Sequence, residues 1–232
     1  MIINLDDTEH EVIIELAPIT LMPHSVHTFL SQLSEGYWTR GTPAIVMNPG
    51  HVLQACPHPC LETKAMGGSY PGDPYVDMRH AGLDTVSFQE YHPEYPHEKY
   101  TIGFAGRPHS GPEFYINMMN NTLDHGPKEA LPKKAIVVED DEEEEEEEAD
   151  EMMTMEPDPC FGKIISGFEV IDKISEGMTR GDLPDESKET KDDDDEVALS
   201  DSLLIQPVRI VSMSIISESD DSSTSEDTRD EL

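Results

Sequence analysis

One short segment holds the side chains whose types and spacing most directly suggest chemistry. Cys56, His58 and Cys60 alternate with prolines, and thiols and an imidazole are ligands that zinc accepts. A tetrahedral structural site needs a fourth ligand, and none stands at a diagnostic spacing. Cys56 and Cys60 are also close enough in sequence to form a disulfide, and Cys160 completes the three cysteines. We expect loop cysteines, no metal and no cofactor, and the sequence leaves the oxidation state open.

Two acidic runs suggest a second kind of chemistry, the loose binding of cations. Residues 139–151 are acidic at every position except Ala149, and residues 182–196 form the other run. Neither has the spacing of an EF-hand loop, so the runs predict at most low-affinity calcium binding by solvated carboxylates. The simpler interpretation is that the charges keep the protein soluble. Because such runs repel themselves and bury little apolar area, we expect them to be disordered.

The charge of the whole chain restricts its partners. Its 232 residues include 15 Lys and Arg against 50 Asp and Glu, which gives a net charge of −35 at pH 7. Nucleic acid and anionic membrane surfaces would repel such a chain. No apolar run approaches the ~20 residues that span a bilayer. We therefore expect basic, cationic or neutral partners, no nucleic acid, no membrane span in this chain and a monomer.

The helices that must position a site are predicted by apolar periodicity. The first is expected to open at residues 22–24, because apolar residues recur at i, i+3, i+4 and i+7 from Val26. Gly36 supplies its stop. The second is predicted over residues 166–176, with Ser166 as its N-cap. Both helices carry one apolar face, which predicts that each packs against a core.

The predicted strands are short apolar runs bounded by turn residues. Between them, residues 57–99 lack sustained periodicity, so we expect a long loop there with short strands such as residues 85–88. The other strands are predicted at residues 11–16, in two runs within 42–55 broken by Asn48-Pro49-Gly50, and at 203–216, where Pro207 suggests an edge or a bulge.

Two further strand-like runs, residues 100–104 and 113–118, flank a loop rich in glycine and proline. Phe114 and Ile116 share one face of the second run, and Tyr115 shares the other face with Glu113 and Asn117. Because successive side chains of a strand point to opposite faces, this pattern predicts a strand with a core side and a groove side.

This region, residues 101–118, resembles the signature of the cyclophilin family, in which a small-residue strand and a glycine loop lead into a Gln-Phe-Phe-Ile strand. Here that strand reads Glu113-Phe114-Tyr115-Ile116. Three other blocks follow the family order, at residues 16–38, 48–55 and 158–175. The resemblance implies a mainly β fold, an eight-stranded antiparallel closed barrel capped by two α-helices. It also implies peptidyl-prolyl cis-trans isomerase chemistry.

The resemblance implies one cyclophilin-like domain over residues 1–216, with acidic disordered insertions at 139–157 and 180–200. A disordered acidic tail, residues 217–232, follows and ends in Arg-Asp-Glu-Leu. That ending is similar to an endoplasmic reticulum retention signal, with Arg in place of Lys. A leader upstream of Met1 would place the protein in the lumen of the endoplasmic reticulum. Without a leader we expect it in the cytoplasm.

The resemblance further implies where catalysis would occur. Cyclophilins rotate X-Pro bonds, whose barrier is ~20 kcal/mol, by holding the proline in an apolar pocket while an arginine donates to the prolyl nitrogen. Aligned on Pro49-Gly50, the arginine position holds Val46, which has no donor. His51 takes the place of the phenylalanine on the pocket floor. His51, Arg107 or Arg40 are the candidates for a substitute donor.

The other matching positions predict a peptide-binding groove. Gly103 and Phe104 match positions whose backbone pairs with the peptide, and Asp158 replaces a family histidine. We therefore expect a domain that binds proline-containing or extended peptides, with weak or absent isomerase activity. The alternative is an active isomerase that assists protein folding. The predicted peptide-binding residues are His51, Val52, Gln54, Gly103, Phe104, Glu113, Tyr115 and Leu123.

Overall fold

The computed structural model describes residues 1–40, 42–58, 73–106, 109–127, 156–179, 182 and 202–216. Their strands pair into one antiparallel sheet in the order β2-β1-β9-β4-β5-β7-β6-β8-β3. The strands are β1 (Ile2–Leu5), β2 (Thr8–Glu11), β3 (Ile13–Leu16), β4 (Ala44–Met47), β5 (Val52–Cys56), β6 (Thr101–Phe104), β7 (Phe114–Asn117), β8 (Cys160–Ser166) and β9 (Leu203–Ser212). The helices are α1 (Pro23–Ser34), α3 (Pro74–Ala81), α4 (Thr122–His125) and α5 (Phe168–Ser175).

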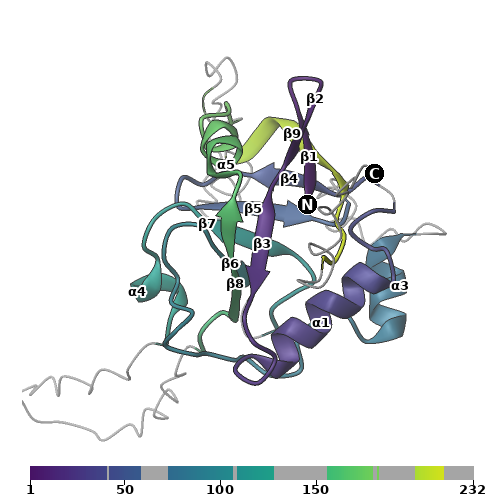
Figure 1. Ribbon diagram of the computed structural model, residues 1–232, viewed down its shortest axis with the longest axis vertical. Coiled ribbons are helices and arrows are strands. Elements are labelled where there is room, and N and C mark those ends of the chain that lie inside the picture. The colour runs from purple at the N-terminus through teal and green to yellow at the C-terminus, as the bar shows by residue number, and fades with distance from the viewer. Residues whose placement is uncertain are drawn as a thin grey trace, which may run out of the picture.

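The sheet nearly closes into a barrel because its two outer strands belong to one chain segment (Figure 1). Only Val12 separates β2, which pairs with β1, from β3, which pairs with β8. Val12 is buried and exchanges backbone hydrogen bonds of 2.8 and 2.9 Å with Met1. Gly167 fits against this bend, since a Cβ there would lie 2.6 Å from the carbonyl oxygen of Glu11. With β2 and β3 counted as one bent strand, the predicted eight-stranded barrel is confirmed.

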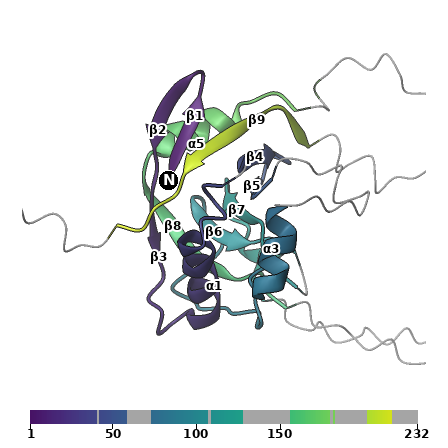
Figure 2. The same cartoon turned by 90° about the vertical axis from the view of Figure 1, so that its right-hand side faces the viewer.

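The helices α1 and α5 lie at opposite ends of this barrel, and α3 lies beside α1 (Figures 1 and 2). Pro23 occupies the first turn of α1, where its missing N–H costs no hydrogen bond. The second helix begins later than predicted. Ser166 is the last residue of β8, and Gly167, in the left-handed region with φ of +86°, precedes α5 without a side-chain cap.

Four phenylalanines form the centre of the core. Phe29 of α1 packs against Phe104, Phe114 and Phe161, with ring centroids 6.2, 5.7 and 5.0 Å away. All four side chains are at most 1% exposed. Since the three partners come from β6, β7 and β8, the ring of Phe29 joins the first helix to the wall that also carries the site.

Three features differ from the sequence prediction. The helix α3 forms within the predicted loop. Asp73 caps its start by accepting from the N–H of Tyr75 at 3.0 Å, and Gly82 caps its end at φ of +68°. No strand forms at residues 85–88. A hairpin, β1 and β2, also precedes the predicted first strand, and its turn places Asp6 and Asp7 at φ of 52° and 59°. Asp tolerates this left-handed geometry better than most residues.

Several predictions concern residues beyond those that the structure describes. The run at 139–151, residues 183–196 of the second run, the tail ending in Arg-Asp-Glu-Leu, Cys60 and Arg107 lie outside the described ranges. Disorder and calcium binding in the acidic runs stay predictions. Among the helices that the structure describes, none combines the length and the apolar character needed to cross a bilayer.

Replacing Phe29 with alanine should lower the free energy of unfolding by about 3–5 kcal/mol, because the ring leaves a cavity among three buried aromatic side chains. Urea unfolding followed by circular dichroism measures this loss. Phe88→Ala is the matched control, since that ring is 64% exposed and its removal should cost less than about 1 kcal/mol. Equal losses in the two variants would contradict the proposed core.

Candidate functional site

A cleft of about 270 Å³ lies at the side of the barrel. It is lined by residues of β4, β5 and β7 and by residues of the segments that connect the strands. Its wall comes from six stretches of chain that are far apart in sequence. The lining residues are Met47, Pro49, His51, Val52, Gln54, Ala105, Gly106, Tyr115, His125, Asp158 and Ser202.

The predicted turn at residues 48–50 forms one rim of this cleft. The Asn48 side chain accepts from the N–H of Gly50 at 3.1 Å and donates to the carbonyl of Ser175 at 2.7 Å. Its backbone N–H donates to the carbonyl of Ser202 at 2.8 Å. Gly50 stands at φ of +91°, which a residue with a side chain rarely adopts. One asparagine therefore ties the β4–β5 turn to the segment before β9.

Val46, which the resemblance places at the family's arginine position, is not among the residues that line the cleft. The register of β4 shifts between Ile45 and Met47 on both of its neighbours, so that Met47, and not Val46, lies opposite Gln54. Met47 lines the cleft, and it also belongs with Val46, Ala44 and Cys56 to a small buried apolar cluster. The extra residue of a β-bulge reverses which side chains face the groove. Neither valine nor methionine can donate a hydrogen bond.

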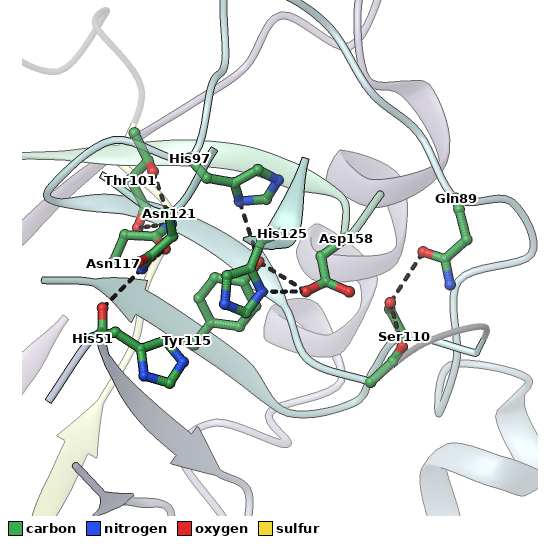
Figure 3. A network of polar contacts seen from close by, with 11 residues as sticks. His51, Gln89, His97, Thr101, Ser110, Tyr115, Asn117, Asn121, His125 and Asp158 are labelled. Atoms are coloured by element: carbon green, nitrogen blue, oxygen red, sulfur yellow. Dashed lines mark hydrogen bonds and ion pairs between the residues drawn. The ribbon is translucent and has the colours of Figure 1, made fainter. Parts of the chain in front are cut away.

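Tyr115 forms part of the cleft wall and its ring is 2% exposed. The hydroxyl lies 3.3 Å from Oδ2 of Asp158 and 3.2 Å from Nδ1 of His97 (Figure 3). Gly103 makes room for it, since a Cβ at that position would come within 2.8 Å of the hydroxyl. The tyrosine is thus fixed by polar contacts at its tip and by a glycine beneath it.

Asp158 joins this tyrosine to a histidine that the sequence analysis did not select. Nδ1 of His125 lies 2.6 Å from Oδ2 of Asp158, and the backbone N–H of Asp158 donates to the carbonyl of His125 at 2.8 Å. The His125 ring also lies beside those of His51 and His97, with centroids 5.6 and 5.8 Å apart. Nothing in the spacing of the chain's ten histidines distinguishes His125 or His97.

The comparisons with known proteins agree with this fold. Residues 1–198 match the family model described as cyclophilin type peptidyl-prolyl cis-trans isomerase/CLD. The chain belongs to the cyclophilin family. None of the curated protein sequences compared with it matches.

Two solved structures of a cyclophilin type peptidyl-prolyl cis-trans isomerase from Cryptosporidium parvum are similar to this cyclophilin. The first, determined in the presence of the dipeptide Ala-Pro, has 16% sequence identity and a TM-score of 0.50, and the match covers 93% of this chain and 98% of that one. The second has 15% identity and a TM-score of 0.48, with 91% and 93% covered. At these identities the likeness concerns the fold alone.

Four of the predicted peptide-binding residues of this cyclophilin line the cleft: His51, Val52, Gln54 and Tyr115. Gly103 and Phe104 lie elsewhere, since β6 is paired on one side with β7 and on the other with β8. The Phe104 N–H donates to Pro159 at 3.0 Å, and its side chain is in the core. The backbone that reaches the cleft from this strand belongs to Ala105 and Gly106, two residues further on.

The other two predicted positions are also outside the cleft lining. Leu123 is 87% exposed on α4, and Glu113 is buried near Tyr75, where burial, Cys56 and Glu113 together raise the pKa of the Tyr75 hydroxyl. Of the alternative donors, Arg40 lies over the ring of Tyr37 at 5.0 Å. Among the described residues that line the cleft, none is an arginine.

Cys160, at the start of β8, is buried beside the carbonyl of Pro96, 3.5 Å from Sγ. Burial raises the pKa of its thiol to about 12. Because nucleophilic attack and metal ligation need the thiolate, Cys160 is inert near neutral pH.

Removing the Tyr115 hydroxyl should cost stability without altering the shape of the cleft. We expect Tyr115→Phe to lower the free energy of unfolding by about 1–2 kcal/mol, because the buried Asp158 carboxylate and His97 both lose a partner. Denaturant unfolding provides the value. Tyr91→Phe is the matched control, since this half-exposed hydroxyl makes no hydrogen bond within the described residues, and it should be nearly neutral. A neutral Tyr115→Phe would show that the network does not support the cleft.

Proposed function

We propose that this cyclophilin binds proline-containing or extended peptide segments in the cleft, with weak or absent isomerase activity. One observation carries the proposal: the cleft has an apolar wall and an amide, and among the described residues that line it there is no arginine. Peptide recognition needs the wall, whereas fast rotation of the X-Pro bond needs the donor.

The apolar wall suits a proline ring. Tyr115 offers an aromatic face fixed by its hydroxyl, and the side chains of Met47 and Val52 flank it. A pyrrolidine ring is apolar and rigid, so its burial against such a wall costs little conformational entropy. The Gln54 amide, opposite Met47 in the register, can donate to and accept from a peptide backbone.

The missing guanidinium sets the expected rate. Removal of one donor aimed at a charge that develops in the transition state costs about 3–4 kcal/mol, or two to three orders of magnitude in rate. Binding in the ground state depends on different contacts, so affinity need not fall in parallel. We therefore expect the cleft to bind peptides but to accelerate their isomerisation only weakly or not at all.

The acidic runs favour cationic peptides over neutral ones. The described chain leaves the cleft after His125 and returns to it at Asp158, so the run at 139–151 is tethered at the cleft by both ends. The second run, 182–196, is followed by Ser202, which lines the opposite rim. Dense negative charge tethered near a cleft raises the local concentration of cations and the rate at which they associate.

A proline peptide tests the proposed binding directly. We expect calorimetry to show saturable binding of Ala-Ala-Pro-Ala and little binding of Ala-Ala-Ala-Ala, because the tetraalanine lacks the ring that fills the apolar wall. A protease-coupled assay with a proline peptide should give a turnover two to three orders of magnitude below that of a competent cyclophilin. Equal affinities for the two peptides would refute the binding proposal, and a competent rate would favour the active-isomerase alternative.

A charge series tests the partner class separately. We expect a proline peptide flanked by lysines to associate at least about tenfold faster than its glutamate-flanked counterpart at low salt. The difference should shrink at high ionic strength, since salt screens exposed charges. Stopped-flow fluorescence measures both rates. A full-length variant with residues 139–151 changed to glutamine is the control, and an unchanged rate difference in it would contradict a role for that run.

A further inference from the structure

His125 lines the cleft, and only one of its two ring nitrogens contacts the Asp158 carboxylate. Its side chain is 15% exposed, against 4% for its partner Asp158. Nδ1 lies 2.6 Å from the Asp158 carboxylate, and Figure 3 shows the second ring nitrogen turned away from that carboxylate. Among the described residues, Nε2 has no hydrogen-bond partner. The imidazole is therefore oriented by a group behind it and has one polar atom left for a ligand.

The chemistry of the pair determines where the ring hydrogen resides. An ionised carboxylate can only accept hydrogen bonds, so Nδ1 of His125 must be the donor in the contact with Asp158. Nε2 is then an acceptor in the neutral ring and a donor in the protonated ring. This arrangement can present a cationic N–H to the cleft.

We propose that His125, positioned by Asp158, acts as the hydrogen-bond donor to the prolyl amide of a bound peptide, in place of the absent arginine. The inference rests on the proposed function, because it requires that a proline peptide occupies the cleft. As the X-Pro bond twists, the lone pair of the prolyl nitrogen localises and accepts from Nε2–H. The proton stays on the imidazole throughout, and no covalent bond forms or breaks.

The other polar groups near the cleft fit this role less well. His97 is 0% exposed and contacts Tyr115, so it cannot meet a peptide. His51 lines the cleft, but no hydrogen bond of the described residues fixes its ring, whose orientation is set only by stacking on His125 at 5.6 Å. A preorganised donor stabilises a transition state better than one that must first be ordered. Of these three described histidines, only His125 combines exposure to the cleft with a ring fixed by a hydrogen bond.

Because the donor needs its second proton, turnover should depend on pH. The titratable groups that face the ring come from four elements, and Asp124 precedes it within α4. They are His51 at the start of β5, His97 before β6, Tyr115 in β7 and Asp158 before β8. A pH profile of the unaltered protein cannot separate the three histidines, so the test compares variants.

Exchange spectroscopy of a proline peptide, which needs no coupling protease, measures kcat/KM between pH 5.5 and 8. We expect kcat/KM of the wild type to fall as the pH rises. His125→Ala should remove most of the remaining acceleration at pH 5.5 and flatten the profile, while calorimetry shows peptide affinity within about threefold of wild type. His27→Ala, which removes an exposed histidine of α1, is the matched control and should change nothing.

Three outcomes would overturn the inference. The first is a His125→Ala protein that binds the peptide and keeps the wild-type rate and profile. The second is a loss of pH dependence in His51→Gln, with His125→Ala unaffected. The third is a wild-type protein that binds the peptide without accelerating its isomerisation, which would leave the proposed binding intact. Absence of binding by the wild type would instead refute the proposed function itself. Unchanged affinity in the variants also shows that they are folded.

Discussion

The buried carboxylate of Asp158 is the contact on which the candidate site depends. A charge removed from water is costly unless polar groups surround it, and here His125 and the Tyr115 hydroxyl lie 2.6 and 3.3 Å from one oxygen. The hydroxyl of Tyr115 also lies 3.2 Å from Nδ1 of His97, so the acid, the tyrosine and two histidines form one connected network. The backbone N–H of Asp158 donates to the carbonyl of His125. This hydrogen bond joins the two segments between which the first acidic run lies in the sequence. Asp158 thus orients Tyr115 in the cleft wall and His125, the candidate donor. It also joins the two segments that flank the first acidic run.

The fold below this site has the barrel architecture of its family. The barrel depends on backbone pairing and on a core around Phe29, and neither requires an arginine at the groove. Function resides in side chains added to a fold, so an apolar wall can persist when a catalytic donor is replaced. In this chain Asp158 and His125, which belongs to the short helix α4, both line the cleft.

The sequence predicts the parts of the structure that follow from local patterns. Periodicity from Val26 predicts α1, and the proline and glycine at residues 49–50 predict the turn between β4 and β5. The helix α3 has equally local signals, because an Asp-Pro pair starts it and a glycine ends it. It was not predicted because its apolar periodicity is weak. The bulge at Val46 depends on how two neighbouring strands pair with β4, and no pattern within β4 reports that. For the same reason His125, which reaches the cleft only through the packing of a four-residue helix, could not be selected from the sequence.

The central claim is that the cleft receives a proline beside Tyr115 without help from a guanidinium. A crystal structure of the protein with a bound proline tetrapeptide tests it most directly. The account predicts a pyrrolidine ring against Tyr115 and Val52, with Nε2 of His125 as the nearest side-chain donor to the prolyl nitrogen. A guanidinium from Arg40 or Arg107 within about 3.2 Å of that nitrogen would contradict it.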